Sequence, residues 1–320
     1  MLVLSRKKNE SIVINDHIVN ETRLQYLRDL DTSTPASTTP TISVPGSFTS
    51  GGSGGQKSND HSDRLELWNI TTMSEGAHAI KFGTRVRYNR DANNTNAGYN
   101  GSFAFSSLDS YIAMLNGLAQ GQTMSQIAAA GGLPLTLSYA TGNTKVLVSQ
   151  FDGALFFQDD WKVNQFFTLS TGLRWESQNH INDHSDWGPR ISFAYALDGH
   201  KDRKQAKTVL RGGYGFFYDR LRLGSLLNAT RFNGGANSQT QYTVLNPTCF
   251  DPTSLNAILA NPSICGATSS VAKTVVQIAP TYKSPYTSQF SAGLERQVSK
   301  TTSMTVTYMH SYGLHQMVTR

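Results

Sequence analysis

The chain has 320 residues, of which 16% are charged and 38% hydrophobic, and it contains 27 Gly, 15 Phe and 13 Tyr. This composition favours β-strands joined by polar turns over a helical enzyme, and the length allows one large all-β unit. The formal net charge of +6 comes from scattered Lys and Arg rather than from a basic stripe, which argues against nucleic-acid binding by most of the chain.

The sequence shows neither a transmembrane helix nor a signal peptide. A transmembrane helix needs a run of about 18 or more apolar residues, and none occurs. At the N-terminus, MLVL precedes Arg6, Lys7 and Lys8, which reverses the usual order of a signal peptide. A membrane β-barrel stays open as an interpretation, because its strands need only about 9 to 11 residues that alternate between lipid and lumen.

The first third of the chain predicts a strand, a loop and a hairpin. Residues 18–29 can form a strand, and residues 32–63, rich in Pro, Ser, Thr and Gly, predict a long flexible surface loop. Residues 64–73 and 78–91 then predict a hairpin. The second arm alternates between two faces: one holds Ile80, Phe82, Thr84, Val86 and Tyr88, and the other holds Lys81, Gly83, Arg85, Arg87 and Asn89.

The rest of the chain predicts an excursion with short helices, followed by more strands. Residues 107–121 and 123–132 have helix-like spacing and end at Gly. The strands expected after them are 148–163, 166–177, 189–197, 208–220, 286–299 and 301–313. Within 166–177, Leu173 and Trp175 share one face, and Arg174 and Glu176 share the other.

Strand length and turn asymmetry favour a membrane barrel over a soluble sandwich. The expected strands have about 10 to 13 residues, compared with about 5 or 6 in globular proteins. Turns are short on one side and long on the other, which is typical of periplasmic turns and external loops. Aromatic residues near strand ends suit the girdles at the two membrane interfaces: Trp161, Trp175, Trp187, Tyr218 and Tyr312. A soluble β core is the alternative explanation of these rings.

Several longer stretches carry a family resemblance. QDDWKV, LSTGLRWE, WGPRISFAYA and RGGYGFFYDR occur in the order and spacing of the barrel of Oar-like TonB-dependent outer-membrane receptors, which the chain resembles from about Val19 to Arg320. The resemblance implies a barrel of about 22 strands with a plug. It also implies an outer-membrane location, lipid and the TonB complex as partners, and import of a bulky, unknown ligand. In such a barrel the alternation would turn Arg85, Arg87, Arg174 and Glu176 toward the lumen.

About ten to twelve strands can be counted, which is about half of a barrel of that size. An open half-barrel would leave backbone N–H and C=O groups unpaired in hydrocarbon. The plug, the TonB-contacting segment and a signal sequence are also not recognisable. The sequence therefore predicts an incomplete transmembrane β-barrel of long antiparallel strands, with short helices in long external loops, as an internal piece of a receptor.

The opening, MLVLSRKKNESIVIND, resembles a different family, the carbon storage regulators, which are small RNA-binding translational repressors. That resemblance implies RNA contacts by Leu4 and Arg6, but the basic Val-His-Arg segment of the family does not follow. We expect two parts, 1–18 and 19–320, with an RNA-binding regulator as one alternative function and a soluble β adhesin-like domain as another. RNA is not the expected partner of the whole chain.

Cys249 and Cys265 are the only cysteines, and they lie 16 positions apart in a Pro- and Asn-rich stretch. Two explanations stay open: a loop-closing disulfide on an oxidising surface, or two unpaired thiols. Neither a CxxC pair nor a nearby His completes a metal site around them.

No motif predicts catalysis or a cofactor. His180, Asp183, His184 and Asp186 are spaced as metal ligands could be, but polar turn chemistry explains this connection between strands better. GxSxG, P-loop and HExxH motifs are missing. We therefore expect no enzyme activity, no metal and no cofactor.

Overall fold

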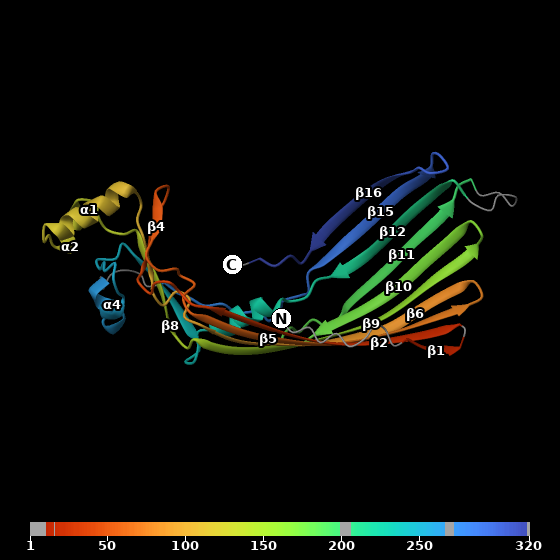
Figure 1. Cartoon of the computed structure of the whole chain (residues 1–320), viewed down its shortest axis with the longest axis horizontal. Coiled ribbons are helices and arrows are strands. Elements are labelled where there is room, and N and C mark those ends of the chain that lie inside the picture. Colours follow the sequence, from red (N-terminus) through yellow and green to blue (C-terminus); the bar gives the residue numbers. More distant parts are fainter. Residues whose placement is uncertain (1–10, 16, 199–205, 266–271, 319–320) are drawn as a thin grey trace.

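The computed structural model describes residues 11–15, 17–198, 206–265 and 272–318, and these residues form two sheets (Figure 1). The larger sheet has ten antiparallel strands in the order β1-β2-β5-β6-β9-β10-β11-β12-β15-β16, and the smaller one has six, in the order β14-β13-β8-β7-β3-β4. The edge strands β1 and β16 do not pair with each other within the described residues. The predicted fold class, an all-β incomplete barrel with short helices in long loops, is confirmed.

Long strands, most of them with the alternation described above, build the ten-stranded sheet. Their bounds are β1 Ser11–Asn15, β2 Ile18–Ser33, β5 Ser58–Glu75, β6 His78–Thr95, β9 Lys145–Asn164, β10 Phe167–Gln178, β11 Asp186–Ala196, β12 Thr208–Tyr218, β15 Tyr286–Gln297 and β16 Ser303–Leu314. β5, β6 and β9 have 18, 18 and 20 residues, more than the 9 to 11 or so that a tilted barrel strand needs to cross a bilayer. These three strands therefore continue beyond a membrane-spanning part.

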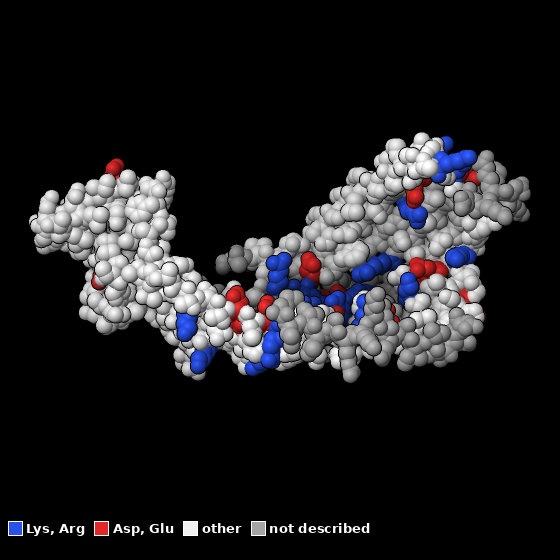
Figure 2. Space-filling model, in the orientation of Figure 1, with Lys and Arg blue, Asp and Glu red and all other residues white. Residues whose placement is uncertain are grey.

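Strand pairing gives the sheet one polar and one apolar face. Arg85 lies opposite Ala154, and Arg174 lies opposite Phe156 and Gly188, so the predicted inward residues share one face across four strands. The opposite face carries large exposed apolar side chains, among them Leu24, Phe82, Leu155, Phe157 and Ile191. We call the first face inner and the second outer. Figure 2 shows Lys, Arg, Asp and Glu gathered in the hollow of the sheet.

The two ends of the sheet differ, as predicted. At one end, short turns join β5 to β6, β9 to β10, and β15 to β16. At the other end, the long connections 34–57, 96–144 and 219–285 leave the sheet, and the first two together with much of the third gather into a separate cap (Figure 1). No helix in the described ranges is both long and apolar enough to cross a membrane.

The cap combines short strands and short helices. Its elements are β3 Thr41–Val44, β4 Phe48–Ser50, β7 Ser102–Ala104, α1 Leu108–Ala119, α2 Met124–Ala129, β8 Thr136–Gly142, β13 Gln239–Leu245, α4 Asn256–Ala260, the 3-10 helix η1 Pro262–Cys265, and β14 Ala272–Thr274. The two expected helices are present as α1 and α2. Each begins with a capping box, Ser107 with Ser110 and Thr123 with Gln126, in which side chains satisfy the free N–H groups of the first turn.

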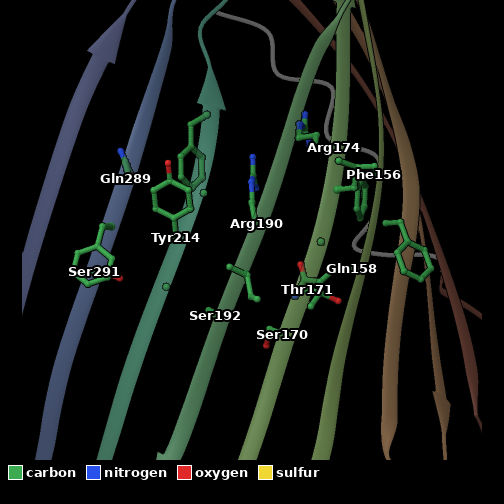
Figure 3. A pocket seen from close by; sticks show the side chains of 18 of the residues that line it. Phe156, Gln158, Ser170, Thr171, Arg174, Arg190, Ser192, Tyr214, Gln289 and Ser291 are labelled. Atoms are coloured by element: carbon green, nitrogen blue, oxygen red, sulfur yellow. The ribbon is translucent and has the colours of Figure 1, made fainter.

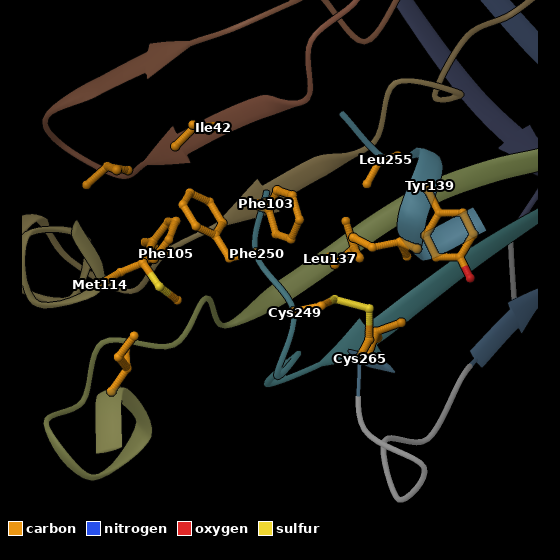
Figure 4. Close-up of a cluster of buried hydrophobic side chains, with 14 residues drawn as sticks. Ile42, Phe103, Phe105, Met114, Leu137, Tyr139, Cys249, Phe250, Leu255 and Cys265 are labelled. Atoms are coloured by element: carbon orange, nitrogen blue, oxygen red, sulfur yellow. A yellow bond between two sulfur atoms is a disulfide. The ribbon is translucent and has the colours of Figure 1, made fainter. Parts of the chain in front are cut away.

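The cap has its own apolar core (Figure 4). Phe103, Phe105 and Phe250 meet edge to face, with ring centroids 5.0 and 5.5 Å apart. Ile42 and Val44 of β3 are buried in the same core. The expectation of a flexible loop over 32–63 is therefore wrong: β3 and β4 join the smaller sheet, and β5 already begins at Ser58, because apolar residues between the Pro and Gly positions are buried there.

β1 and β2 form an antiparallel hairpin that spans the predicted boundary after residue 18. Ser11 lies opposite Glu21 and Asn15 lies opposite Ile18, with an irregularity between Val13 and Asn15. The division into 1–18 and 19–320 stays a prediction.

Candidate functional site

The four residues predicted to face the lumen lie together on the inner face, and each forms an ion pair. Arg85 holds Glu66 with two hydrogen bonds, Nε to Oε1 at 2.9 Å and Nη2 to Oε2 at 3.1 Å. Arg87 donates from Nε to Asp152 Oδ2 at 3.0 Å, and Arg174 donates from Nε to Glu176 Oε1 at 2.7 Å. Hydrogen bonds between ions are stronger than neutral ones, so these pairs fix the side chains against the wall.

Arg220 joins two of these pairs, Arg87–Asp152 and Arg174–Glu176, and sequence reasoning missed it. Its Nη1 atom forms an ion pair with Asp152 Oδ1 at 2.7 Å, and its Nη2 atom donates to Glu176 Oε1 at 3.0 Å. The side chain of Asp152 is only 2% exposed, so its charge is balanced almost entirely by Arg87 and Arg220. The position of Asp152 could have been predicted in part. Asp152 lies two residues before Ala154 on β9 and therefore on the same face, and Ala154 lies opposite Arg85.

Arg190 extends the cluster to β11. Its guanidinium lies over the ring of Phe217, 4.4 Å from the centroid, which is a favourable cation–π geometry. Arg190 and Arg174 line the same hollow of about 510 Å³, together with Phe156, Gln158 and Gln289 (Figure 3). The hollow therefore combines arginine N–H groups with aromatic and amide surface.

We call this cluster the lumen lattice: Arg85, Arg87, Arg174, Arg190 and Arg220 with Glu66, Asp152 and Glu176. Five guanidiniums and three carboxylates leave a formal excess of two positive charges. Because guanidinium groups bind carboxylates and phosphates in a bidentate manner, this surface suits an anionic group.

Residues 219–231, which we call the inner loop, hold Arg220 and contain helix α3, Leu223–Arg231. Gln150 Nε2 donates to the carbonyl oxygen of Leu221 at 2.8 Å. At the far end of the loop, Arg231 donates to Thr144 O at 3.3 Å and also to Asn93 Oδ1. Burial lowers the pKa of both Arg220 and Arg231 from the ordinary value, so the loop carries two desolvated cations onto the inner face.

The predicted turn between β10 and β11 uses its polar residues as hydrogen-bonding groups. His180 Nε2 lies 2.8 Å from Ser149 O, and His184 Nδ1 lies 2.9 Å from Ser177 Oγ. Asp183 accepts from the Ser185 hydroxyl at 2.9 Å and from the Ser284 N–H at 3.2 Å. Although burial opposes ionisation, these hydrogen bonds hold the pKa of Asp183 below its ordinary value. No group of three His, Cys, Asp or Glu suited to a metal ion occurs in the described part of the chain.

The other predicted site residues lie elsewhere. Cys249 and Cys265 form a disulfide in the cap core and not on the larger sheet that carries the lumen lattice (Figure 4). Leu4 and Arg6 lie outside the described residues.

The aromatic residues predicted for girdles lie in the barrel strands. Trp161 stacks on His78 with centroids 5.5 Å apart, and Trp175 lies 6.3 Å from Trp187 on the outer face. Tyr218 lies beside Tyr286, and Tyr312 is 59% exposed on β16.

The chain matches the family described as outer membrane beta barrel domain over residues 8–186 and 180–320. Two crystal structures of mutants of the ferric enterobactin receptor from Pseudomonas aeruginosa are similar in fold. The single mutant has 10% identity and a TM-score of 0.50, with 93% of this chain and 32% of that chain covered. The double mutant has 10% identity and a TM-score of 0.51, with 93% and 33% covered. This chain thus spans about a third of the length of those receptors, and no curated protein matches it.

Proposed function

The chain belongs to the outer membrane β-barrel domain family and is located in the outer membrane, and from this premise we propose that it forms part of the barrel of a TonB-dependent receptor. The proposed parent protein imports a bulky ligand through a plugged lumen, with energy relayed by the TonB complex. This role is transport and not catalysis.

The observation that carries the proposal is the lumen lattice, an arginine-rich cluster held on the inner face of a sheet whose outer face is apolar. An apolar outer face with a polar inner face is the arrangement of a barrel wall that separates lipid from an aqueous lumen. Because the lattice has more guanidiniums than carboxylates, we propose that the ligand carries carboxylate or phosphate groups.

The Oar-like type of receptor is the finer part of this proposal. It is supported by the stretches QDDWKV, LSTGLRWE, WGPRISFAYA and RGGYGFFYDR, which fall on β9 to β12 and their connections. The contact with TonB and the identity of the ligand belong to the parent protein and are proposed with it.

The two alternatives gain no support from the comparisons. A carbon storage regulator-like function would use residues 1–18, whereas the family match begins at residue 8 and runs through the barrel strands. A soluble adhesin-like domain does not explain the exposed apolar outer face. The resemblance of the opening to a carbon storage regulator remains a prediction about residues 1–18 alone.

The proposal can be tested by following which compounds cells remove from a mixed medium. Strains that carry the parent protein, lack it, or carry it without a functional TonB are compared by mass spectrometry of the medium. We expect an anionic compound whose depletion requires both the parent protein and TonB.

Two variants connect uptake to this site. Arg190→Gln removes a cation that forms no ion pair with the described residues, so the variant keeps the fold while uptake falls by roughly tenfold, the usual effect of one charge-assisted hydrogen bond. Lys57→Gln, at an exposed position before β5, is the control and leaves uptake unchanged. Uptake that is independent of TonB, or equal in both variants, would contradict the proposal.

A further inference from the structure

A second charged cluster lies on the outer face of the sheet, where the lumen lattice does not reach. Strand pairing places Arg28 of β2 opposite Asp63 of β5, and Asp63 opposite Arg90 of β6. Arg28 Nε donates to Asp63 Oδ1 at 2.8 Å, and Arg90 Nη1 lies 3.5 Å from Asp63 Oδ2. Two guanidiniums on different strands therefore converge on one carboxylate, and we call these three residues the outer row.

Strand parity shows that the outer row faces away from the lumen. Its neighbour Arg64 points to the inner face, where its Nε atom donates to Asn89 at 3.1 Å. The next row on the same face, two residues closer to the short turns, consists of the exposed side chains of Tyr26, Leu65 and Tyr88. The row after it consists of Leu24, Leu67 and Val86. In the other direction the strands continue toward the cap (Figure 1). The outer row therefore lies directly on the cap side of these two apolar rows, and one further row toward the cap, Leu30, His61, Ala92 and Leu147, mixes apolar and polar side chains.

The outer row has unbalanced positive charge on its surface. The side chains of Arg28 and Arg90 are 50% and 40% exposed, whereas that of Asp63 is 14% exposed. Tyr26 also donates its hydroxyl to Asp63 Oδ1 at 2.6 Å, so the carboxylate is enclosed by its donors. One carboxylate balances one guanidinium, and each guanidinium has five N–H donors, of which Asp63 uses few.

We propose that the outer row binds a phosphate group on the headgroup of a membrane glycolipid in the outer leaflet. Asp63 holds the two guanidiniums side by side, so that their remaining N–H groups can donate to one phosphate. The acyl chains of the lipid would lie along Leu24, Leu67 and Val86, and Tyr26 and Tyr88 would lie at the level between chains and headgroup.

Position on the sheet favours a lipid phosphate over a free phosphate in solution. Basic side chains at the edge of an apolar band attract anionic headgroups, and the chains anchored in that band add apolar contact that a free ion cannot make. This site is independent of the lumen and of the proposed import, because it depends only on the outer-membrane location of the barrel.

The test measures lipid retention by native mass spectrometry of the parent protein purified in detergent. The probes are a bis-phosphorylated lipid A, the same lipid after removal of its phosphates, and inorganic phosphate. For the double variant Arg28→Gln/Arg90→Gln we expect the affinity for phosphorylated lipid A to fall at least roughly tenfold, as expected for loss of charge-assisted hydrogen bonds. Arg64→Gln, on β5 between the two substituted strands but on the inner face, is the matched control and retains the lipid.

A second variant separates binding from folding. Arg28→Lys/Arg90→Lys keeps both charges and should retain part of the affinity, whereas a merely structural role would make both double variants equal. The proposal is overturned if the glutamine variant binds lipid A as tightly as the native protein. It is also overturned if dephosphorylated lipid A binds equally well, or if inorganic phosphate binds as tightly as the lipid.

Discussion

Arg220 connects the inner loop to the barrel wall, so Arg220→Gln should release residues 219–231 from the inner face. The native side chain reaches two carboxylates, Asp152 at 2.7 Å and Glu176 at 3.0 Å. Glutamine keeps similar length and polarity but removes the charge. The carboxylates remain paired with Arg87 and Arg174, so the wall itself should stay folded.

The size of the effect follows from burial. Breaking a buried ion pair costs about 3 to 5 kcal/mol when one charge is left without a partner, and less when another cation remains. Arg220 makes two such pairs, and because each carboxylate keeps one arginine we expect about 1.5 kcal/mol for each pair, about 3 kcal/mol together. The remaining contacts of the loop, from Gln150 to Leu221 and from Arg231 to Thr144, contribute about 1 kcal/mol each and cannot replace it.

Hydrogen exchange followed by mass spectrometry measures the opening of the loop directly. A loss of about 3 kcal/mol corresponds to exchange roughly 100-fold faster for backbone amides of residues 223–231. Arg211→Gln is the control, because its pair with Glu295 at 3.2 Å has side chains 60% and 41% exposed and contributes at most about 1 kcal/mol. Equal exchange in native protein and Arg220→Gln would show that the ion pairs do not hold the loop.

Two further predictions concern the cap and its connection to the barrel. The double variant Cys249→Ser/Cys265→Ser should lower the stability of the cap by about 3 kcal/mol, as expected for a closed loop of this length. Limited proteolysis should then cut residues 232–265 faster, while the barrel strands β5, β6 and β9 to β12 stay intact. Hydrogen bonds lower the pKa of Asp183 in the folded protein, so the ionised carboxylate stabilises the folded state above the ordinary pKa of 3.8. This contribution to the free energy of unfolding is lost as the pH falls through the lowered pKa of Asp183 in the folded protein. Denaturant midpoints measured between pH 5 and pH 2 should show this loss in the native protein but not in Asp183→Asn.

The barrel strands could be predicted because their signal is local. Each face is encoded by alternate residues of one segment, as in Ile80 to Tyr88, and pairing with neighbours only extends that pattern. The same alternation placed Arg85, Arg87, Arg174 and Glu176 on the inner face. Arg220 was less accessible, because the strand expected over 208–220 ends at Tyr218 and Arg220 lies in the loop that follows, where alternation no longer decides the face.

The sheet of the cap could not be predicted, because it joins short segments that are distant in sequence. β3 pairs in parallel with β7, and β8 pairs with β13 roughly a hundred residues later. Strands of three to seven residues give too little alternation to detect, and Pro- and Gly-rich segments indicate loops even where Ile42 and Val44 are buried. Helices α1 and α2 of the cap were predicted, because their periodicity and Gly stops are local. The cysteine spacing also pointed to a local constraint, but it left the disulfide undecided.

The cap and the barrel wall differ in how they are stabilised, and this difference bears on the path of an anion. The cap segments 34–57, 96–144, 232–265 and 272–274 contain only four charged residues, Lys57, Asp109, Asp251 and Lys273, so apolar packing and the disulfide supply most of the stability of the cap. Between the cap and the hollow of the sheet, three arginine side chains are held in place by their contacts: Arg231 and Arg220 of the inner loop, and Arg190 of β11. Since Arg220 is already paired with two carboxylates, an incoming anion competes with them there, whereas Arg190 forms no ion pair with the described residues. The first strong anion contact is therefore expected at Arg190, below the inner loop and not in the cap.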